Sequence, residues 1–294
     1  MAPSANLRWG KHVLGTIIAG RYELLEEIGR GRLGIVYKAR KDEDEQLYAV
    51  KILSQYDERD VKRFHREARA ARKLSHPNVV RLLDNGSTAD GAPFLVMELV
   101  HGRSLRNEIR MHTYLPAELA IPIFVQVCRA LEHMHLNGIV HRDLKPANIM
   151  LMQDRSADDF VKLVDFGLAL PADPEAARDE RVTLDGYVTG TPAYMSPEQC
   201  LAEHVDSRSD IYSLGCVMFR TLTGIAPIGG ATVHDTMNNQ LMGQPTPFSR
   251  VSPDLKIDNE LQNIVLRCLE KKREDRYQSA EDVRSALIDL LGRA

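Results

Sequence analysis

Four side chains suited to phosphoryl transfer lie close together in this sequence. Asp143, Lys145 and Asn148 belong to the run HRDLKPAN (141–148), and a second carboxylate, Asp165, follows in the triplet DFG. Such a transfer requires an acceptor for the proton of the attacking hydroxyl, a cation for the migrating charge and oxygen ligands for Mg²⁺. A loop of this composition could also simply be solvated. The other parts of a nucleotide site decide between the two interpretations.

A glycine-rich stretch upstream could hold the phosphates of a nucleotide. It consists of Gly29, Arg30, Gly31, Arg32, Leu33, Gly34, Ile35 and Val36. The same spacing also suits a dinucleotide-binding fold, but there the glycines open a helix. Here the residues after Val36 (YKA) continue as a strand. The sequence therefore predicts a hairpin lid that can lower backbone amides onto phosphates.

A lysine and a glutamate complete the set of candidate charged groups. Lys51 ends the strand-like run YAVK, and Glu67 follows on a predicted amphipathic helix with Phe64, Ala71 and Leu74 on the same face. An inward-facing glutamate is costly unless it is paired, and Lys51 can supply the pair. The alternative is a surface glutamate among neighbouring arginines.

The elements that must position these residues change in character along the chain. Residues 1–21 show no clear period and are expected to form an arm. Strand-like runs at 22–28, 35–37, 47–50, 79–83 and 94–100 precede helix-like runs at 116–137, 206–223, 258–270 and 279–291. We therefore predict a β-rich lobe with one helix over 22–100 and a helical lobe over 101–294. Pro122 is expected to kink or restart the first long helix.

Composition narrows the class of protein. The chain has 294 residues, of which 44% are hydrophobic and 27% charged, and a net charge of −3 argues against a nucleic-acid binder held by bulk electrostatics. Its four cysteines lack paired spacing and read as buried thiols of a reducing compartment. His133 and His135 lack partners at metal-ligand spacing. With no apolar run long enough for a bilayer, we expect a cytoplasmic protein, or the cytosolic domain of a longer membrane-anchored one.

Together the motifs resemble the protein kinase superfamily, and its serine/threonine branch in particular. The lysine after Asp143 and the run GTPAY (190–194) are typical of that branch, and the runs DIYSLG (210–215) and RYQSAE (276–281) look like those of bacterial Hanks-type kinases. The resemblance covers residues 22–292 as one domain. It implies the α+β, two-lobed protein kinase fold.

The resemblance also implies roles for individual residues. Asp143 would be the catalytic base, Lys145 would neutralise the γ-phosphate, and Thr191 would bridge the two. Lys51, paired with Glu67, would contact the α- and β-phosphates, and Asn148 and Asp165 would hold the metal. The adenine side of the site would take Ile28, Val36, Ala49, Met97, Glu98 and Val100, beside the glycine-rich residues 29–36. Structural roles would fall to His141, Phe166, Asp210 and the buried pair of Glu198 with Arg276.

The implied function is transfer from ATP with Mg²⁺, or Mn²⁺ in its place, to serine and threonine residues of proteins. Candidate sites of autophosphorylation are Thr183 and Thr189. Ser104 and Ala147 stand where basophilic relatives carry acidic residues, so no strong demand for arginine upstream of the acceptor is expected; Glu108 is the acidic alternative. Dimerisation through the N-terminal lobe is left open. The rival readings are a nucleotide-binding pseudokinase scaffold and a kinase of small molecules.

Overall fold

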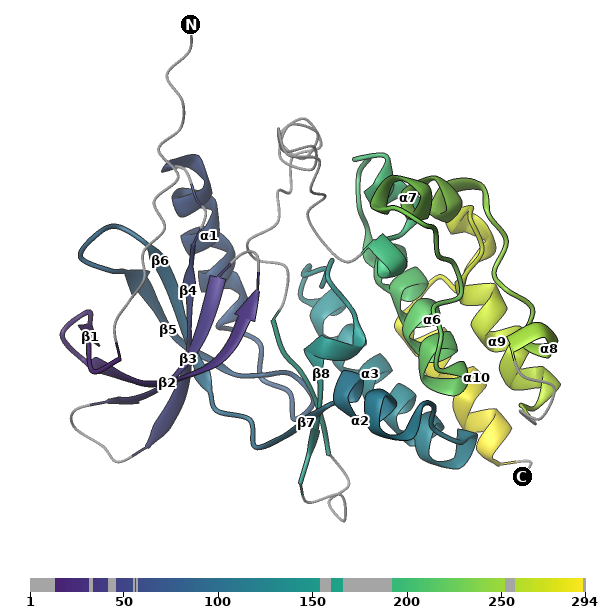
Figure 1. Ribbon diagram of the computed structural model, residues 1–294, viewed down its shortest axis with the longest axis horizontal. Coiled ribbons are helices and arrows are strands. Elements are labelled where there is room, and N and C mark those ends of the chain that lie inside the picture. The colour runs from purple at the N-terminus through teal and green to yellow at the C-terminus, as the bar shows by residue number, and fades with distance from the viewer. Residues whose placement is uncertain are drawn as a thin grey trace, which may run out of the picture. The chain divides into compact units, whose positions relative to one another are not determined.

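The computed structural model describes residues 14–31, 34–41, 46–54, 56, 58–153, 160–165, 192–251 and 257–292. The chain divides into two compact units, Met1–His101 and Gly102–Ala294. Strands dominate the first unit and helices the second (Figure 1). Within the described residues, no helix is both long and apolar enough to cross a membrane.

The first unit is built on an antiparallel sheet with the strand order β1-β2-β3-β4-β6-β5. Its elements are β1 (Ile17–Ile18), β2 (Tyr22–Gly31), β3 (Gly34–Lys41), β4 (Leu47–Leu53), α1 (Glu58–Ala71), β5 (Leu82–Ser87) and β6 (Pro93–Glu98). An arm was expected over residues 1–21, but Ile17–Ile18 within it form β1, an edge strand of the sheet.

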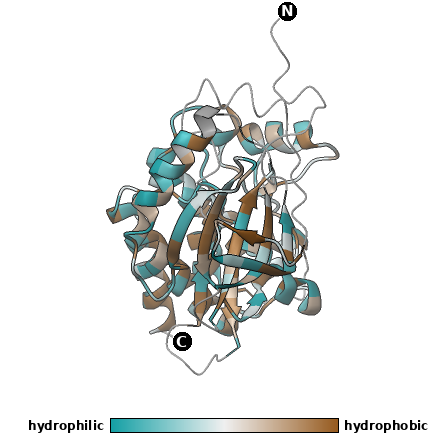
Figure 2. Ribbon diagram, turned by 90° about the vertical axis from the view of Figure 1, so that its left-hand side faces the viewer, coloured by the Kyte–Doolittle hydropathy of each residue, from teal (hydrophilic) through white to brown (hydrophobic). Residues whose placement is uncertain are grey.

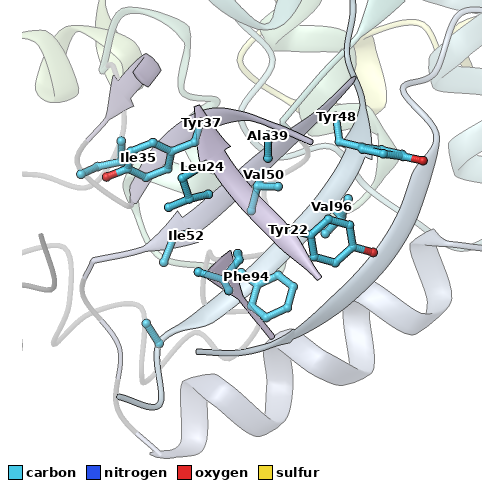
Figure 3. Packing of buried hydrophobic residues seen from close by; sticks show 12 residues of the cluster. Tyr22, Leu24, Ile35, Tyr37, Ala39, Tyr48, Val50, Ile52, Phe94 and Val96 are labelled. Carbon is cyan, nitrogen blue, oxygen red and sulfur yellow. The ribbon is translucent and has the colours of Figure 1, made fainter. Parts of the chain in front are cut away.

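Alternation along the strands gives this sheet two different faces. One face carries a hydrophobic cluster that includes Tyr22, Leu24, Tyr37, Val50 and Phe94, all nearly or fully buried (Figure 3). Edge-on ring contacts join Tyr22 to Phe94 at 6.4 Å between centroids, a favourable arrangement for aromatic pairs. Hydrophobic residues line the middle strands of this sheet in Figure 2.

Helix α1 packs against β5 and β6, and its buried Phe64, Ala68 and Ala71 lie outside that cluster. A polar clamp adds to this contact. The Nδ1 atom of His65 accepts a hydrogen bond from the Asn85 side chain at 2.9 Å, and its Nε2 lies 3.2 Å from Oγ of Ser87. The clamp fixes the helix that carries Glu67 to an edge strand of the sheet.

The second unit combines helices with a small sheet in the order β7-β8-β9. The sheet consists of β7 (Gly102–Ser104), β8 (Ile149–Met152) and β9 (Val161–Leu163). The helices are α2 (Leu105–His112), α3 (Ala117–Leu136), α5 (Pro197–Cys200), α6 (Ser207–Thr223), α7 (Val233–Met242), α8 (Phe248–Val251), α9 (Asn259–Cys268) and α10 (Ala280–Leu291). Short 3₁₀ turns are η1 (Pro146–Asn148), η2 (Pro192–Tyr194) and η3 (Arg273–Asp275).

The core of this unit is centred on α3 and α6. Almost every residue of α6 from Ser209 to Thr223 is buried, and α6 packs on both α3 and α9. Because a helix that is buried all round has few positions for charge, each buried polar residue on it requires a partner. Asp210, Tyr212 and Ser213 are such residues.

Two expectations about these elements were wrong in detail. Of the run expected as a strand at 79–83, Val79 and Val80 are buried but precede β5, which starts at Leu82 and continues through the polar residues up to Ser87. Pro122 lies inside α3 without restarting it, since the helix is continuous over Ala117–Leu136. Like any proline inside a helix, it removes one intrahelical hydrogen bond.

Candidate functional site

The run 141–148 folds into a tight polar cluster within the second unit. The Lys145 Nζ atom donates to Oδ2 of Asp143 at 2.6 Å, and both side chains are about one-fifth exposed. Leu144, between them, is buried and anchors the loop. The loop thus presents a carboxylate and an ammonium group to solvent from a fixed base.

Hydrogen bonds from its amide nitrogen orient the Asn148 side chain. Its Nδ2 donates to the backbone oxygen of Asp143 at 2.8 Å and to Oδ2 of Asp143 at 3.2 Å. The side chain is 5% exposed, so the amide is held in one orientation. Because the nitrogen is committed to Asp143, the Oδ1 atom is the part of Asn148 that can bind a cation.

The β8–β9 pairing brings Asp165 next to this cluster. The amide of Val164 donates to the backbone oxygen of Asn148 at 2.9 Å, and Asp165 follows directly. Asp165 has φ of +61° and Arg142 has φ of +63°, a left-handed conformation that non-glycine residues seldom adopt. Strain of this kind is maintained only where the surroundings enforce it. Here it occurs beside both candidate carboxylates.

Asp210 holds the backbone of the same loop from α6. Its Oδ2 accepts from the amide of His141 at 2.8 Å, and its Oδ1 accepts from the amide of Arg142 at 2.9 Å. His135 lies 2.8 Å from Oδ2. Burial raises the pKa of Asp210, but hydrogen bonds from His135 and from the loop outweigh it and hold the pKa below its ordinary value. The carboxylate therefore stays charged although it is 1% exposed.

His141 lies at the centre of this arrangement and is fully buried. Its Nδ1 atom accepts from the amide of Asp143 at 3.3 Å. Burial lowers the pKa of His141 despite the nearby carboxylates. The imidazole is therefore a neutral support for the backbone of Asp143.

Helix α5 secures the loop from another side. The Gln199 Nε2 atom donates to the backbone oxygen of Arg142 at 2.7 Å. Gln199 also closes a capping box with Ser196 at the start of α5, which fixes the side chain. The loop is thus held at Arg142 by Asp210 on one side and Gln199 on the other.

Glu198 and Arg276 form a bidentate ion pair with distances of 2.9 and 3.0 Å. The side chains are 3% and 0% exposed. The remaining donors of Arg276 bind backbone oxygens of Arg208, Glu270 and Lys271 at 2.7–2.9 Å. Burial raises the pKa of Glu198, but Arg276 and Ser209 outweigh it and keep the pKa low.

The glycine-rich stretch of the first unit forms a hairpin between β2 and β3, as predicted, with Gly31 opposite Gly34. A β-carbon on Gly34 would lie 2.3 Å from the backbone oxygen of Ile52, whereas one on Gly29 or Gly31 would meet only ordinary contacts. Gly34 is therefore required by the close approach of β3 to β4. Ile35 is 6% exposed and belongs to the hydrophobic cluster. Its side chain therefore lies on the cluster face of the sheet and is not available to a nucleotide on the other face.

Strand register places other residues that were predicted to bind the nucleotide on the opposite face of the sheet from Ile35. Val36 pairs with Lys51, and Ala49 pairs with Met97. These four side chains therefore lie on the face of the sheet opposite the hydrophobic cluster. Lys51 is 8% exposed and Glu67 is half-buried.

The two ends of this face differ in exposure. Ile28 is 44% exposed. The Glu98 Oε1 atom accepts from the amide of Arg81 at 2.8 Å, so its side chain is engaged within the first unit, and Val100 is half-buried.

Several predicted residues lie outside the described part of the chain. They are Arg32, Leu33, Phe166, Thr183, Thr189 and Thr191. Two further residues were not singled out from the sequence as supports of the loop, namely His135 and Gln199. His135 is 75 residues from Asp210 along the chain, so no local pattern relates them. The Ser196–Gln199 capping signature was visible, but not its contact with Arg142.

Known proteins resemble this chain in sequence and structure. Residues 22–287 match the family described as protein kinase domain. Serine/threonine-protein kinase pkn3 of Myxococcus xanthus is 38% identical over 277 residues, which cover 93% of this chain and 50% of that protein. Serine/threonine-protein kinase PknB of Mycobacterium leprae is 39% identical over 277 residues, which cover 92% of this chain and 43% of that protein.

A solved structure shows the same likeness. The crystal structure of Rad53 1–466 in complex with AMP-PNP superposes with a TM-score of 0.74 and 28% identity, covering 90% of this chain and 64% of that one. The chain spans about half the length of the curated relatives it matches, or less.

Proposed function

The chain belongs to the protein kinase domain family, and on this premise we propose that it transfers the γ-phosphoryl group of ATP to serine and threonine hydroxyls of proteins. Family membership confirms the resemblance drawn from the motifs, and the structural likeness confirms the expected fold. One observation carries the proposal: Lys145 and Asn148 both bind the same oxygen of Asp143.

That arrangement assigns separate tasks to the two oxygens of Asp143. Because Oδ2 already accepts two hydrogen bonds, Oδ1 is the atom that can accept the proton of a substrate hydroxyl as it attacks. Lys145 is held 2.6 Å from Asp143, where its charge can offset negative charge that develops on the transferring group. The loop is pre-organised by Asp210 and Gln199, so this geometry requires no rearrangement during the reaction.

The family implies ATP and a divalent cation, and we assign Mg²⁺, with Mn²⁺ as a substitute, to Asn148 and Asp165. An amide oxygen and a carboxylate suit a hard cation that completes its coordination with phosphate oxygens. Among the described residues no group of three or more His, Cys, Asp or Glu side chains is placed to hold a metal ion. When bound, the cation neutralises charge on the phosphates.

The nucleotide itself is assigned to the first unit. Val36, Ala49 and Met97 offer an apolar surface for the adenine ring, and Lys51 on the same face offers a cation to the phosphates. The ATP analogue bound in the Rad53 structure supports ATP as the nucleotide. We assign Glu67 as the partner that orients Lys51, because α1 is clamped to the sheet through His65.

Two further parts of the proposal concern the setting of the reaction. ATP as a co-substrate fits a cytoplasmic location for this domain. Dimerisation through the first unit remains a proposal, which molar mass in solution would test. No observation favours a pseudokinase, since Lys51, Asp143 and Asp165 are all retained.

The decisive experiment is incubation of the purified chain with labelled ATP and Mg²⁺, alone and with a mixture of proteins, followed by mapping of the label. We expect label on serine and threonine residues of proteins, abolished by a chelator and restored by Mg²⁺ or Mn²⁺. Nucleotide binding without transfer would indicate a scaffold instead. Label confined to small molecules would indicate the other rival function.

A further inference from the structure

A fully buried tyrosine on α6 lies against two cations. Tyr212 is 0% exposed, with the guanidinium carbon of Arg276 4.9 Å and Nζ of Lys271 5.4 Å from its ring centroid. The buried charge of Arg276 is accounted for by its ion pair with Glu198. The charge of Lys271 has no such account, since among the described residues its hydrogen bonds go to neutral oxygens of Tyr212 and Gln240.

These bonds form a directed chain that ends at a backbone carbonyl. Lys271 Nζ donates to Oη of Tyr212 at 3.0 Å, and that hydroxyl donates to Oε1 of Gln240 at 2.5 Å. The Nε2 atom of Gln240 then donates to the backbone oxygen of Pro192 at 3.1 Å. A second bond from Lys271 to the backbone oxygen of Gln240, at 2.8 Å, ties the lysine to α7.

The carbonyl at the end of this chain belongs to η2, which begins directly after Thr191. The same turn is held at Tyr194, whose backbone oxygen accepts from Oγ of Ser213 at 2.8 Å. Both ends of the turn are therefore fixed by side chains of the helical core. Removing one support should let the turn shift without unfolding the unit.

We propose that Lys271, Tyr212 and Gln240 are positioning residues that set the place of the Pro192–Tyr194 turn and thereby the affinity for the protein substrate. This rests on the proposed function, because the turn directly follows Thr191 in the sequence, and the family resemblance assigns Thr191 to bridge Asp143 and Lys145. We call the hydrogen-bonded chain of Lys271, Tyr212 and Gln240 the relay. It contacts neither the proposed ATP site nor the reacting atoms, so its loss should raise KM for the protein substrate and leave KM for ATP unchanged.

Lys271 is half-buried beside an arginine, and placing a second cation there is costly unless the lysine makes interactions that offset the cost. Burial lowers the pKa of Lys271 to about 8. The groups around it are Tyr212, Arg276, Glu270, Cys200 and Cys216. Burial raises the pKa of both Tyr212 and Cys216 well above their ordinary values, so neither changes charge near that pH.

The relay and a purely structural role predict opposite pH dependences. In the unfolded state a lysine side chain has a pKa of about 10.4. Above pH 8 the unfolded state therefore binds more protons at this group than the folded state does. This group consequently makes the stability of the folded state rise with pH. Deprotonation also replaces a charge-assisted donor to Tyr212 by a weaker one. KM for the protein substrate should therefore rise above pH 8 although the contribution of Lys271 to stability does not fall.

The test measures both KM values between pH 7 and 9.5 for the wild type, Lys271→Met, Gln240→Leu and Tyr212→Phe. We expect KM for the protein substrate to rise about three- to tenfold in each variant, as for loss of one hydrogen bond, and the rise above pH 8 to disappear in Lys271→Met. Thr221→Val is the control, because Thr221 is buried on the same helix and its hydroxyl donates within that helix, to the backbone oxygen of Val217. Cys200→Ser should keep the wild-type pH profile.

An activity-independent measurement keeps the relay separate from the proposed function. The amide of Met195 donates to the backbone oxygen of Pro192 at 3.2 Å, so its hydrogen exchange reports the turn. We expect faster exchange in Gln240→Leu and Tyr212→Phe than in Thr221→Val. A wild type that transfers no phosphate would overturn the proposed function; unchanged KM, or unchanged exchange at Met195, would overturn the relay.

Discussion

At the scale of single residues, the candidate catalytic loop depends on which atom of each side chain is already occupied. Asp143 has one oxygen committed to Lys145 and Asn148, and Asn148 has its nitrogen committed to Asp143. Sequence patterns name residues but not atoms. The division of tasks between the two Asp143 oxygens therefore required the structure.

The first prediction concerns that carboxylate. Asp143→Asn preserves shape but removes the proton acceptor, so kcat should fall about 10²- to 10⁴-fold, the usual contribution of a general base. Thermal unfolding should stay close to that of the wild type, because Asp143 is partly exposed. Near-normal turnover in this variant would refute the role of Asp143. Turnover measured beside the melting curve decides the question.

The second prediction contrasts a buried ion pair with one that is partly exposed to solvent. Glu198→Ala should lower the free energy of unfolding by about 3–5 kcal/mol, because it leaves Arg276 charged and buried. Glu281→Ala removes a pair of similar geometry on the surface, Arg284 with Glu281 at 2.6 Å. That change should cost about 1 kcal/mol or less. Denaturant unfolding of both variants checks the difference, and equal losses would contradict it.

At the scale of elements, the position of α1 relative to β5 depends on an imidazole. His65 accepts from Asn85 through Nδ1, so its hydrogen lies on Nε2 toward Ser87. A second proton on Nδ1 would oppose the Asn85 donor. The attachment of the helix that carries Glu67 should therefore depend on pH.

The third prediction gives the sign of that dependence. Burial, with the nearby Arg69, lowers the pKa of His65 below 6.5. The unfolded state then binds more protons at acid pH, so this contribution to stability is present above pH 6.5 and is lost as pH falls through the folded pKa. His65→Gln should lower Tm more at pH 7.5 than at pH 5.5. The exposed His234→Gln is the control, and an equal difference in both variants would refute the clamp.

At the scale of the whole molecule, the arrangement of charge determines which substrates the second unit can accept. Burial raises the pKa of Tyr194, while the positive charges of Arg220 and Arg106 act in the opposite direction. Both guanidinium groups therefore lie within electrostatic reach of the turn that follows Thr191. Glu108, the acidic alternative considered from the sequence, is 4% exposed and thus unavailable to a substrate.

The fourth prediction follows for substrate choice. A peptide library should show no selection for arginine upstream of the acceptor, because Ser104 and Ala147 carry no charge and Arg106 and Arg220 would repel a cation. Arg220→Ala should weaken any preference for acidic residues. Arg110→Ala, on the exposed face of α2, should leave the preference unchanged. A dominant upstream arginine would contradict this account.

The fifth prediction concerns a segment outside the described residues. Arg142 precedes Asp143, and a phosphate on Thr183 would bring negative charge that can order a loop through arginine contacts. Asp185 already contributes negative charge nearby. Mass spectrometry of active enzyme should find Thr183 modified, and Thr183→Ala should lower activity. An unmodified segment with full activity would show that no such switch operates.

The sequence predicted the long elements better than the contacts between them. The helices expected at 116–137 and 206–223 correspond to Ala117–Leu136 and Ser207–Thr223, since long periodic segments and N-caps are local signals. Strand β5 was shifted because Asp84, Asn85 and Gly86 have little intrinsic preference for strands. The bonds of Asp210 to His135 and of Gln199 to Arg142 join distant segments, and no local pattern encodes them.

The close approach of Gly34 to Ile52 has a consequence for mutational scanning of this domain. Any side chain at Gly34 must push β3 away from β4, so its variants would be depleted in a selection for folded protein as well as in one for activity. Substitutions at Gly29 and Gly31 have room and would be depleted only when nucleotide is required. A comparison of the two selections would therefore separate glycines needed for ATP from one needed for the sheet, although all three belong to a single motif.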